Sequence, residues 1–345
     1  MKAALLTGIR QIEIRDVPEP NLEDPGDVLL AVEAIGVCGS DMHYYRTGRI
    51  GDQVVEFPFL IGHECCGRVL AVGDDVSRVK VGQRVAVDPL IWCGRCDQCL
   101  AGREHTCRNQ KFLGCPGQVE GCLAERLIMP AASCYPVPDP MDAETVALIE
   151  PMTIGLYASR LAGEVAGKRV GILGAGPIGL SVLLACRLAG AAETLVTEIR
   201  DYRAAMAAEL GADWTGNAEK TNVAKEILAR RPDGLDVVFE CAGEQSAIDD
   251  ALALVKPGGT IMMVGIPPED RISFEISRLR RREVTVQPVR RQNRCVADTI
   301  DLVAAGRLNG GPMITHRYTL DQTAEAFATV ADYKDNVVKA MVAVE

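Results

Sequence analysis

The sequence lacks an apolar run of the length that crosses a membrane. Its longest stretch without a charged residue is the seventeen residues between Arg169 and Arg187, and four glycines and Pro177 interrupt it. The amino-terminal segment MKAALLTGIRQIEIR carries charges where a secretory signal peptide would be apolar. We therefore expect no membrane-spanning segment, no membrane partner and a cytoplasmic protein.

An excess of basic residues is missing as well. The 37 lysines and arginines are outnumbered by 47 aspartates and glutamates, which gives a formal net charge of -10, and most basic residues are dispersed. The sequence therefore offers no basic patch that would bind a polyanion, and we expect no nucleic-acid partner. The one dense basic run, RLRRRE at residues 278–283, is interpreted as a solvated face.

The thirteen cysteines are not the even set that a disulfide framework requires. In a reducing compartment they are expected to be thiols or metal ligands. The chain has 345 residues, of which 48% are hydrophobic and 24% are charged. It is therefore long enough for two globular domains, and its composition is not that of a disordered protein.

The two halves of the chain differ in their pattern of apolar residues. Short stretches rich in valine and isoleucine, such as GRVLAVGDDV and GQRVAVDPL, fill about the first 150 residues and predict an all-β domain. Beyond about residue 165, apolar strands alternate with alanine-rich helices, which predicts a doubly wound parallel sheet. The fold class expected is thus α/β with an all-β domain. The segment between the halves predicts a helical linker kinked at Pro151.

A glycine motif follows the first strand of the second half. GAGPIG contributes Gly174, Gly176 and Gly179, and Pro177 and Ile178 open the alanine- and leucine-rich helix that follows. In this setting the glycines allow a tight turn, a close approach to a pyrophosphate and close helix packing, with the phosphates at the helix amino terminus. The motif predicts a dinucleotide site, and a purely structural turn is the alternative.

An acidic residue follows the next strand. Glu198 lies nineteen residues beyond Gly179, where a carboxylate accepts hydrogen bonds from ribose hydroxyls and repels a 2′-phosphate. NAD is therefore favoured over NADP. Arg203, a further candidate cofactor contact, and Arg200 keep NADP open, and an ordinary strand-end acid is the alternative interpretation of Glu198.

Four closely spaced cysteines form a second motif. The pattern CxxCxxCx7C contributes Cys93, Cys96, Cys99 and Cys107. Four thiolates at such spacing surround a tetrahedral zinc ion, and a site with four protein ligands has no open position for substrate. A structural zinc that stiffens a loop is predicted, with an iron–sulfur centre or disulfides as alternatives.

A second candidate metal site is dispersed along the chain. His63 and Glu64 are neighbours in GHECC, Cys38 lies twenty-five residues before His63 in GVCGSDMHYY, and Glu150 lies in ALIEP. A catalytic zinc usually takes three protein ligands and keeps one open position. Spacing alone leaves open whether the fold brings these residues together.

The order and separations of the motifs resemble the zinc-containing medium-chain dehydrogenase/reductase family. These motifs are CGSDxHYYxxGRIGD, GHE, the cysteine lobe, ALIEP and GAGPIG. HYYRTGRIGD is most similar to its polyol branch, the sorbitol, xylitol and L-iditol 2-dehydrogenases. The resemblance implies a GroES-like catalytic domain over residues 1–150 with a zinc lobe at about 91–110, and a Rossmann NAD-binding domain over 151–288. It further implies that residues 289–345 partly return to the catalytic domain.

The resemblance also implies two zinc ions in each chain, one structural and one catalytic. The catalytic ligands implied are Cys38, His63 and Glu64, with Glu150 either binding zinc or holding its water. Which acid coordinates stays open. Cys65 and Cys66, despite their position beside the ligands, are interpreted as small packing residues.

The activity implied is reversible oxidation of a secondary alcohol of a polyol by hydride transfer to NAD. Ser40 matches the hydroxyl that bonds the reacting oxygen, and His43 matches the imidazole that passes the proton towards solvent. Polyol hydroxyls need polar partners, for which the resemblance suggests Tyr44, Arg49 and Arg290.

Two other functions remain open: a zinc dehydrogenase of another alcohol, such as an L-threonine 3-dehydrogenase or a secondary alcohol dehydrogenase, and a catalytically silent structural relative. A homotetramer or homodimer is implied, formed through the edge of the Rossmann sheet. GTIMMVGIPP, residues 259–268, is a candidate for that edge, and burial in the core is the alternative.

Overall fold

A computed structural model describes residues 1–344, which form two compact units. The first contains Met1–Glu150, Val296–Ala304 and the chain from Ile314 onward; the second contains Pro151–Cys295 and Ala305–Met313. The chain therefore returns to the first unit twice. The Rossmann segment expected to end at residue 288 lies within a unit that extends to Cys295.

The main sheet of the first unit has seven strands in the order β12-β8-β7-β3-β20-β19, with β11 also paired to β3. All pairs are antiparallel except β19 with β20. Residues of β3 alternate between buried and partly buried, as expected for a strand that packs one face on the core. The strands are β3 (Asp27–Gly36), β7 (Glu64–Val72), β8 (Arg84–Val87), β11 (Arg126–Pro130), β12 (Cys134–Pro136), β19 (Ile314–Thr319) and β20 (Lys339–Ala343).

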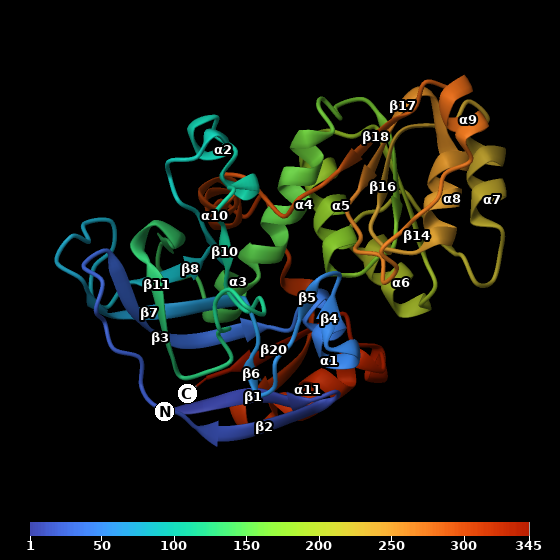
Figure 1. The fold of residues 1–345 in the computed structure, drawn as a ribbon. Coiled ribbons are helices and arrows are strands. Elements are labelled where there is room, and N and C mark those ends of the chain that lie inside the picture. The colour runs from blue at the N-terminus through green and yellow to red at the C-terminus, as the bar shows by residue number, and fades with distance from the viewer. Residues whose placement is uncertain (345) are drawn as a thin grey trace. The chain divides into compact units, whose positions relative to one another are not determined.

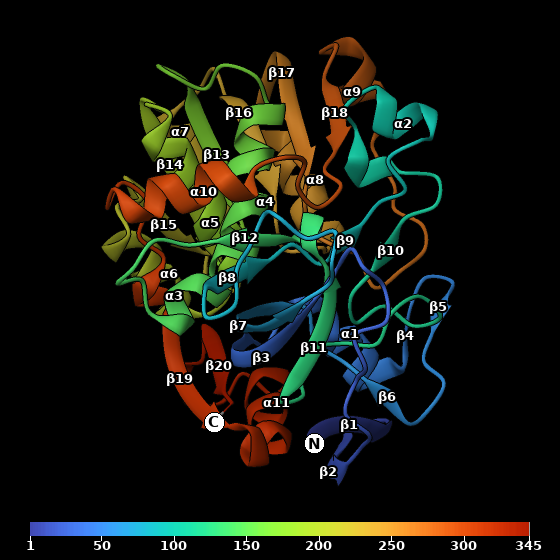
Figure 2. The same cartoon turned by 90° about the vertical axis from the view of Figure 1, so that its left-hand side faces the viewer.

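Shorter elements complete this unit. Its small sheets contain β1 (Lys2–Gly8), β2 (Gln11–Asp16), β4 (Arg49–Ile50), β5 (Gln53–Val54), β6 (Phe59–Leu60), β9 (Leu90–Ile91) and β10 (Lys111–Phe112). Its helices are α1 (Gly39–Thr47), α2 (Asp97–Leu100), η1 (Glu104–Thr106), η2 (Ala131–Ser133), α3 (Ala143–Ala147), α10 (Val296–Ala304), η4 (Leu320–Gln322), α11 (Thr323–Ala331) and η5 (Lys334–Asn336). The expected β domain is present, and Figure 2 shows its strands β3, β7, β8 and β11 together.

The second unit is a six-stranded sheet in the order β15-β14-β13-β16-β17-β18, parallel throughout. Helices cover both faces, α4 and α5 on one and α7 and α8 on the other (Figure 1). The predicted doubly wound fold is confirmed. Its strands are β13 (Arg169–Leu173), β14 (Glu193–Glu198), β15 (Trp214–Asn217), β16 (Leu235–Glu240), β17 (Val255–Met263) and β18 (Thr285–Pro288). Its helices are α4 (Ile149–Leu161), which begins at the end of the first unit, α5 (Pro177–Leu188), α6 (Asp201–Glu209), α7 (Val223–Arg230), α8 (Gln245–Leu254), α9 (Ile276–Arg281) and η3 (Gly311–Met313).

Two local expectations are refined by these elements. The linker is two helices, α3 and α4, and Pro151 lies in the first turn of α4, where its missing N–H breaks no helical bond. The segment 259–268 does not supply the sheet edge, because β17 lies between β16 and β18 and Met262 is buried. The edge strand on this side of the sheet is β18, and β15 is the edge strand on the other side. No helix among residues 1–344 combines the length and apolarity needed to span a bilayer.

Candidate functional site

Strand pairing in the first unit brings together the three dispersed metal-ligand candidates. Cys38 caps the amino terminus of α1 just after β3, and His63 and Glu64 stand at the start of β7. Gly36 pairs with Glu64 across these two strands, so the chain near Cys38 lies beside GHE. One ligand atom from each of the three residues lies within 4.8 Å of the others.

A buried carboxylate that the sequence analysis missed supports His63. Asp41 in α1 is fully buried, and its Oδ1 lies 3.2 Å from Nδ1 of His63. This contact turns the other ring nitrogen, Nε2, towards Ser40 Oγ at 3.5 Å, and that hydroxyl donates to Cys38 Sγ at 3.3 Å. Burial lowers the pKa of His63, but Asp41 and Cys38 outweigh it and raise that pKa well above its usual range.

Lys339 of β20 is the second supporting residue that was missed. It is buried, its Nζ pairs with Glu64 Oε2, and it donates to the Val37 carbonyl at 3.0 Å. A single ammonium therefore holds both Glu64 and the residue before Cys38. The signal in the sequence is a lysine inside the apolar strand VVKAMVAV, where charge is rare unless paired.

Glu150 and His43 lie outside the three-residue ligand group. Glu150, at the start of α4, is almost buried; burial raises its pKa to about 8, with His63 opposing the rise and Glu64 adding to it. Its carboxyl group therefore lies within electrostatic range of the ligand group. His43 is half-buried in α1, and burial together with the Arg46 charge lowers its pKa.

The expected substrate contacts come from both units. Tyr44 is buried, with its hydroxyl donating to Gln53 Oε1 at 3.1 Å. Arg49 is exposed in the β4–β5 hairpin. Arg290 is exposed and follows β18 in the second unit. Tyr44 thus supports the hairpin that presents Arg49.

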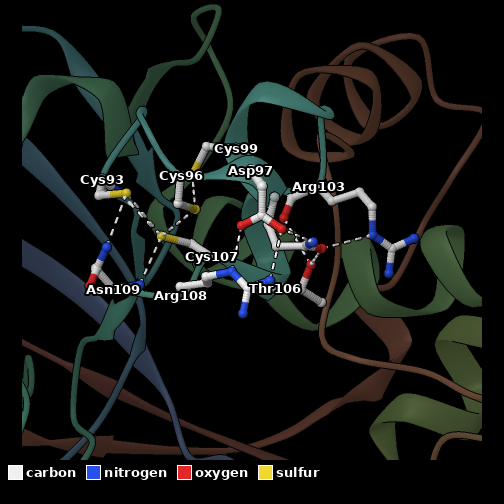
Figure 3. A network of polar contacts seen from close by, with 10 residues as sticks. Cys93, Cys96, Asp97, Cys99, Arg103, Thr106, Cys107, Arg108 and Asn109 are labelled. Carbon is white, nitrogen blue, oxygen red and sulfur yellow. Dashed lines mark hydrogen bonds and ion pairs between the residues drawn. The ribbon is translucent and has the colours of Figure 1, made fainter.

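The four cysteines of the lobe converge, as Figure 3 shows. The Sγ–Sγ distances are 3.5 Å for Cys96 to Cys99, 3.8 Å for Cys96 to Cys107 and 3.5 Å for Cys107 to Cys93. Sulfurs bound at about 2.3 Å to a tetrahedral zinc lie about 3.8 Å apart. The observed distances therefore fit a zinc ion. The four thiols form no disulfide with one another, contrary to the disulfide alternative.

Polar contacts around the lobe favour the thiolate form of Cys93, whereas burial raises the pKa of Cys99 to about 12. Asn109 donates through its backbone to Cys107 Sγ at 3.4 Å and through its amide to Cys93 Sγ at 3.6 Å. Hydrogen bonds from the backbone at Arg95 and from Asn109 lower the pKa of Cys93 to about 6. The paired Asp97 and Arg108 close the lobe beside the sulfurs (Figure 3).

We expect Cys107→Ser to remove one zinc per chain and to lower the melting temperature by at least about 2–4 °C, because the lobe loses the metal that orders it. Elemental analysis and thermal unfolding test this. Cys134→Ser, at a buried thiol of β12, is the control and should keep the full zinc content. A Cys107→Ser protein with unchanged zinc would contradict the assignment.

The glycine-rich turn in the second unit has the expected form. Gly174 has a φ of 101°, and a Cβ there would lie 2.9 Å from the Ala242 nitrogen. Gly176 caps α5, which begins with Pro177 and Ile178. A Cβ on Gly179 would collide with the Gly174 carbonyl oxygen. Side chains at Gly174 and Gly179 would not fit, so the turn keeps the tight form in which the start of α5 suits a pyrophosphate.

Glu198 lies at the end of β14 and is tied to this turn. Its carboxylate accepts hydrogen bonds from the backbone of Ala175 at 2.8 Å, Ile199 at 2.7 Å and Arg200 at 3.1 Å. The Arg203 guanidinium approaches within 3.7 Å of a Cβ placed on Gly176. A carboxylate and a guanidinium therefore both border the predicted cofactor site.

Comparison with known proteins assigns the family. Residues 24–139 match the alcohol dehydrogenase GroES-like domain, and residues 177–305 match the zinc-binding dehydrogenase domain. The chain belongs to the zinc-containing medium-chain dehydrogenase/reductase family, as the resemblance implied, and is an oxidoreductase with a GroES-like and a Rossmann-like part.

Individual relatives agree with this. Sorbitol dehydrogenase of Bacillus subtilis is 36% identical over 99% of this chain and 97% of its own length. An Escherichia coli oxidoreductase/dehydrogenase of unknown specificity involved in membrane biogenesis is 34% identical, with a TM-score of 0.94 over 100% of this chain and 99% of its own. A protein assigned as a zinc-binding dehydrogenase from Sinorhizobium meliloti, bound to NADP, is 33% identical, with a TM-score of 0.90 over 99% of this chain and 98% of its own.

Proposed function

We propose that the protein oxidises a secondary hydroxyl of a polyol to a ketone and transfers the hydride to NAD, at a zinc site formed by Cys38, His63 and Glu64. The observation that carries the proposal is the approach of these three ligand atoms within 4.8 Å of one another. Identity of 36% with a sorbitol dehydrogenase supports a polyol as the substrate.

The residues present fit zinc because they offer a thiolate, an imidazole nitrogen and a carboxylate, with Asp41 and Lys339 fixing two of them. Zinc bound there supplies a Lewis acid that lowers the pKa of the reacting alcohol. Ser40 Oγ lies within 3.5 Å of both Cys38 Sγ and His63 Nε2, and from there its hydroxyl would bond the oxygen of a bound alcohol. His43, whose pKa is lowered, is neutral near pH 7 and accepts the departing proton on its way to solvent. Glu150 supplies a second carboxylate beside the ligands.

We propose two zinc ions per chain, the second held by the cysteine lobe in a structural role. Tyr44, Arg49 and Arg290 are proposed to serve the remaining substrate hydroxyls or the water around them. The division of the chain into a catalytic domain, a Rossmann domain and a returning carboxyl-terminal segment belongs to the same proposal.

Cofactor choice is proposed to depend on Glu198. Its carboxylate borders the site where a 2′-phosphate of NADP would lie, so Glu198→Ala should lower the NAD to NADP ratio of kcat/KM by at least about tenfold, since a repelling charge is removed. Glu209→Ala, at the exposed end of α6, is the control. An unchanged ratio in Glu198→Ala would contradict the role of this carboxylate. NADP, found bound to one relative, is the alternative cofactor.

A homodimer or homotetramer in the cytoplasm is proposed, with β18 as the contact. Among the described residues β18 pairs with β17 on one side only, and such an edge is available to a second chain. Light scattering coupled to size exclusion tests the state, and a monomer at micromolar concentration would contradict it.

The substrate class is tested by initial rates with sorbitol, xylitol, galactitol, L-iditol and threonine, each with NAD and with NADP, before and after chelation. We expect NAD-linked turnover of at least one polyol, lost on chelation. Turnover of threonine alone would favour the threonine dehydrogenase alternative. Absence of any turnover would favour the silent relative.

A further inference from the structure

Glu240, the last residue of β16, is a fully buried carboxylate with no part in the proposed reaction. Its Oε1 accepts backbone hydrogen bonds from Ala242 at 2.8 Å and Gly243 at 2.7 Å. Its Oε2 is buried and has no hydrogen-bond partner in residues 1–344. Burial raises the pKa of Glu240 against the opposing effect of the amides. Burying a carboxyl group is unfavourable unless it is hydrogen-bonded, and Glu240 forms such bonds to the 241–243 turn.

Glu240 lies where the turns after three neighbouring strands meet. Its carbonyl accepts hydrogen bonds from Val264 at 2.8 Å and Gly265 at 2.9 Å, just after β17. The next residue, Cys241, donates to the Leu173 carbonyl at 2.8 Å, at the end of β13. A Cβ on Gly265 would lie 2.7 Å from Glu240 Oε2, so the turn after β17 is packed directly on the carboxylate.

The turn that Glu240 holds is in contact with the glycine-rich turn. A Cβ on Gly174 would lie 2.9 Å from the Ala242 nitrogen, the same N–H that donates to Glu240. The strand order reverses between β13 and β16, and ligands of open parallel sheets bind at the carboxyl ends of strands at such a reversal. A shift of the 241–243 turn would therefore change the backbone that faces the pyrophosphate.

We propose that Glu240 is a positioning residue for the dinucleotide: its Oε1 fixes the 241–243 turn against the glycine-rich turn and thereby sets cofactor affinity. The inference rests on the proposed use of a nicotinamide dinucleotide. In this proposal Glu240 acts by accepting hydrogen bonds at Oε1. A glutamine side chain accepts the same bonds, and a shorter side chain does not reach them.

The test measures the Kd of NADH by fluorescence titration of the full-length protein. The melting temperature of each variant is measured as well. Glu240→Ala should raise Kd at least about tenfold, equivalent to about 1.4 kcal/mol, whereas Glu240→Gln should stay within about threefold of the parent. The matched control is Asp236→Ala, at the amino end of the same strand, where the carboxylate accepts from the Arg169 backbone at 2.8 Å. It should lower the melting temperature and leave Kd within about twofold.

The inference is overturned if Glu240→Ala binds NADH like the parent, if Glu240→Gln binds as weakly as Glu240→Ala, or if Asp236→Ala weakens binding equally. Should Glu240→Ala fail to fold, Glu240→Asp, which withdraws the carboxylate by one methylene, must raise Kd at least about fivefold. A value like the parent's then overturns the inference. Failure of the parent protein to bind NADH would instead refute the proposed function.

Discussion

Replacement of Cys38 by alanine is expected to leave one zinc ion per chain and to reduce NAD-linked turnover by about a thousandfold or more. The thiol is one of three ligand atoms within 4.8 Å of one another, and two remaining ligands hold zinc weakly. Loss of Lewis-acid stabilisation worth several kcal/mol corresponds to a rate loss of that size. Elemental analysis and initial rates measure the two effects.

The matched control for this prediction is Cys65→Ala. Cys65 is buried beside Glu64 but belongs to the apolar core of the first unit, so its loss should cost some stability and no zinc. If Cys38→Ala kept two zinc ions, or if Cys65→Ala lost one, the ligand set proposed here would be wrong.

Replacement of Lys339 by methionine is expected to weaken zinc binding by about 10–100-fold and to destabilise the first unit by about 3–5 kcal/mol. The ammonium pairs with Glu64 and holds the Val37 carbonyl, so its removal leaves a buried carboxylate without its partner and loosens the chain before Cys38. Competition with a chelator and thermal unfolding of the zinc-depleted protein separate the two effects.

Lys220→Met is the control for the Lys339 prediction. Lys220 pairs with Asp201 on the surface, where both side chains are more than 60% exposed, and such pairs contribute little. Both the zinc affinity and the melting temperature should remain those of the parent. Equal behaviour of the two variants would mean that the buried pair does not support the site.

Local motifs carried most of the prediction from sequence. The lobe cysteines lie within a short segment, and GAGPIG stands between a strand and a helix, so spacing and context alone indicated a zinc lobe and a dinucleotide turn. The fold class and the family are confirmed. Periodicity indicated the fold class, because strands and helices leave their period in the sequence, whereas the motifs and their order indicated the family.

Residues that act across the fold were not predictable in this way. Lys339 lies 275 residues from Glu64, and only the pairing of β20 with β3 brings it to the site. The burial of Asp41 against His63 was not predictable either, because no local pattern in the sequence distinguishes this residue from an exposed acid. The same holds for the sheet edge, since β17 and β18 are both short of charge and their order follows from tertiary pairing.

The central claim, oxidation of a polyol at the site of Cys38, His63 and Glu64, is tested most directly by adding zinc back to chelated protein while following NADH formation from a polyol. The rate should be absent without zinc, return in the parent, and not return in Cys38→Ala. Full polyol turnover by Cys38→Ala, or by the parent free of zinc, would contradict the account.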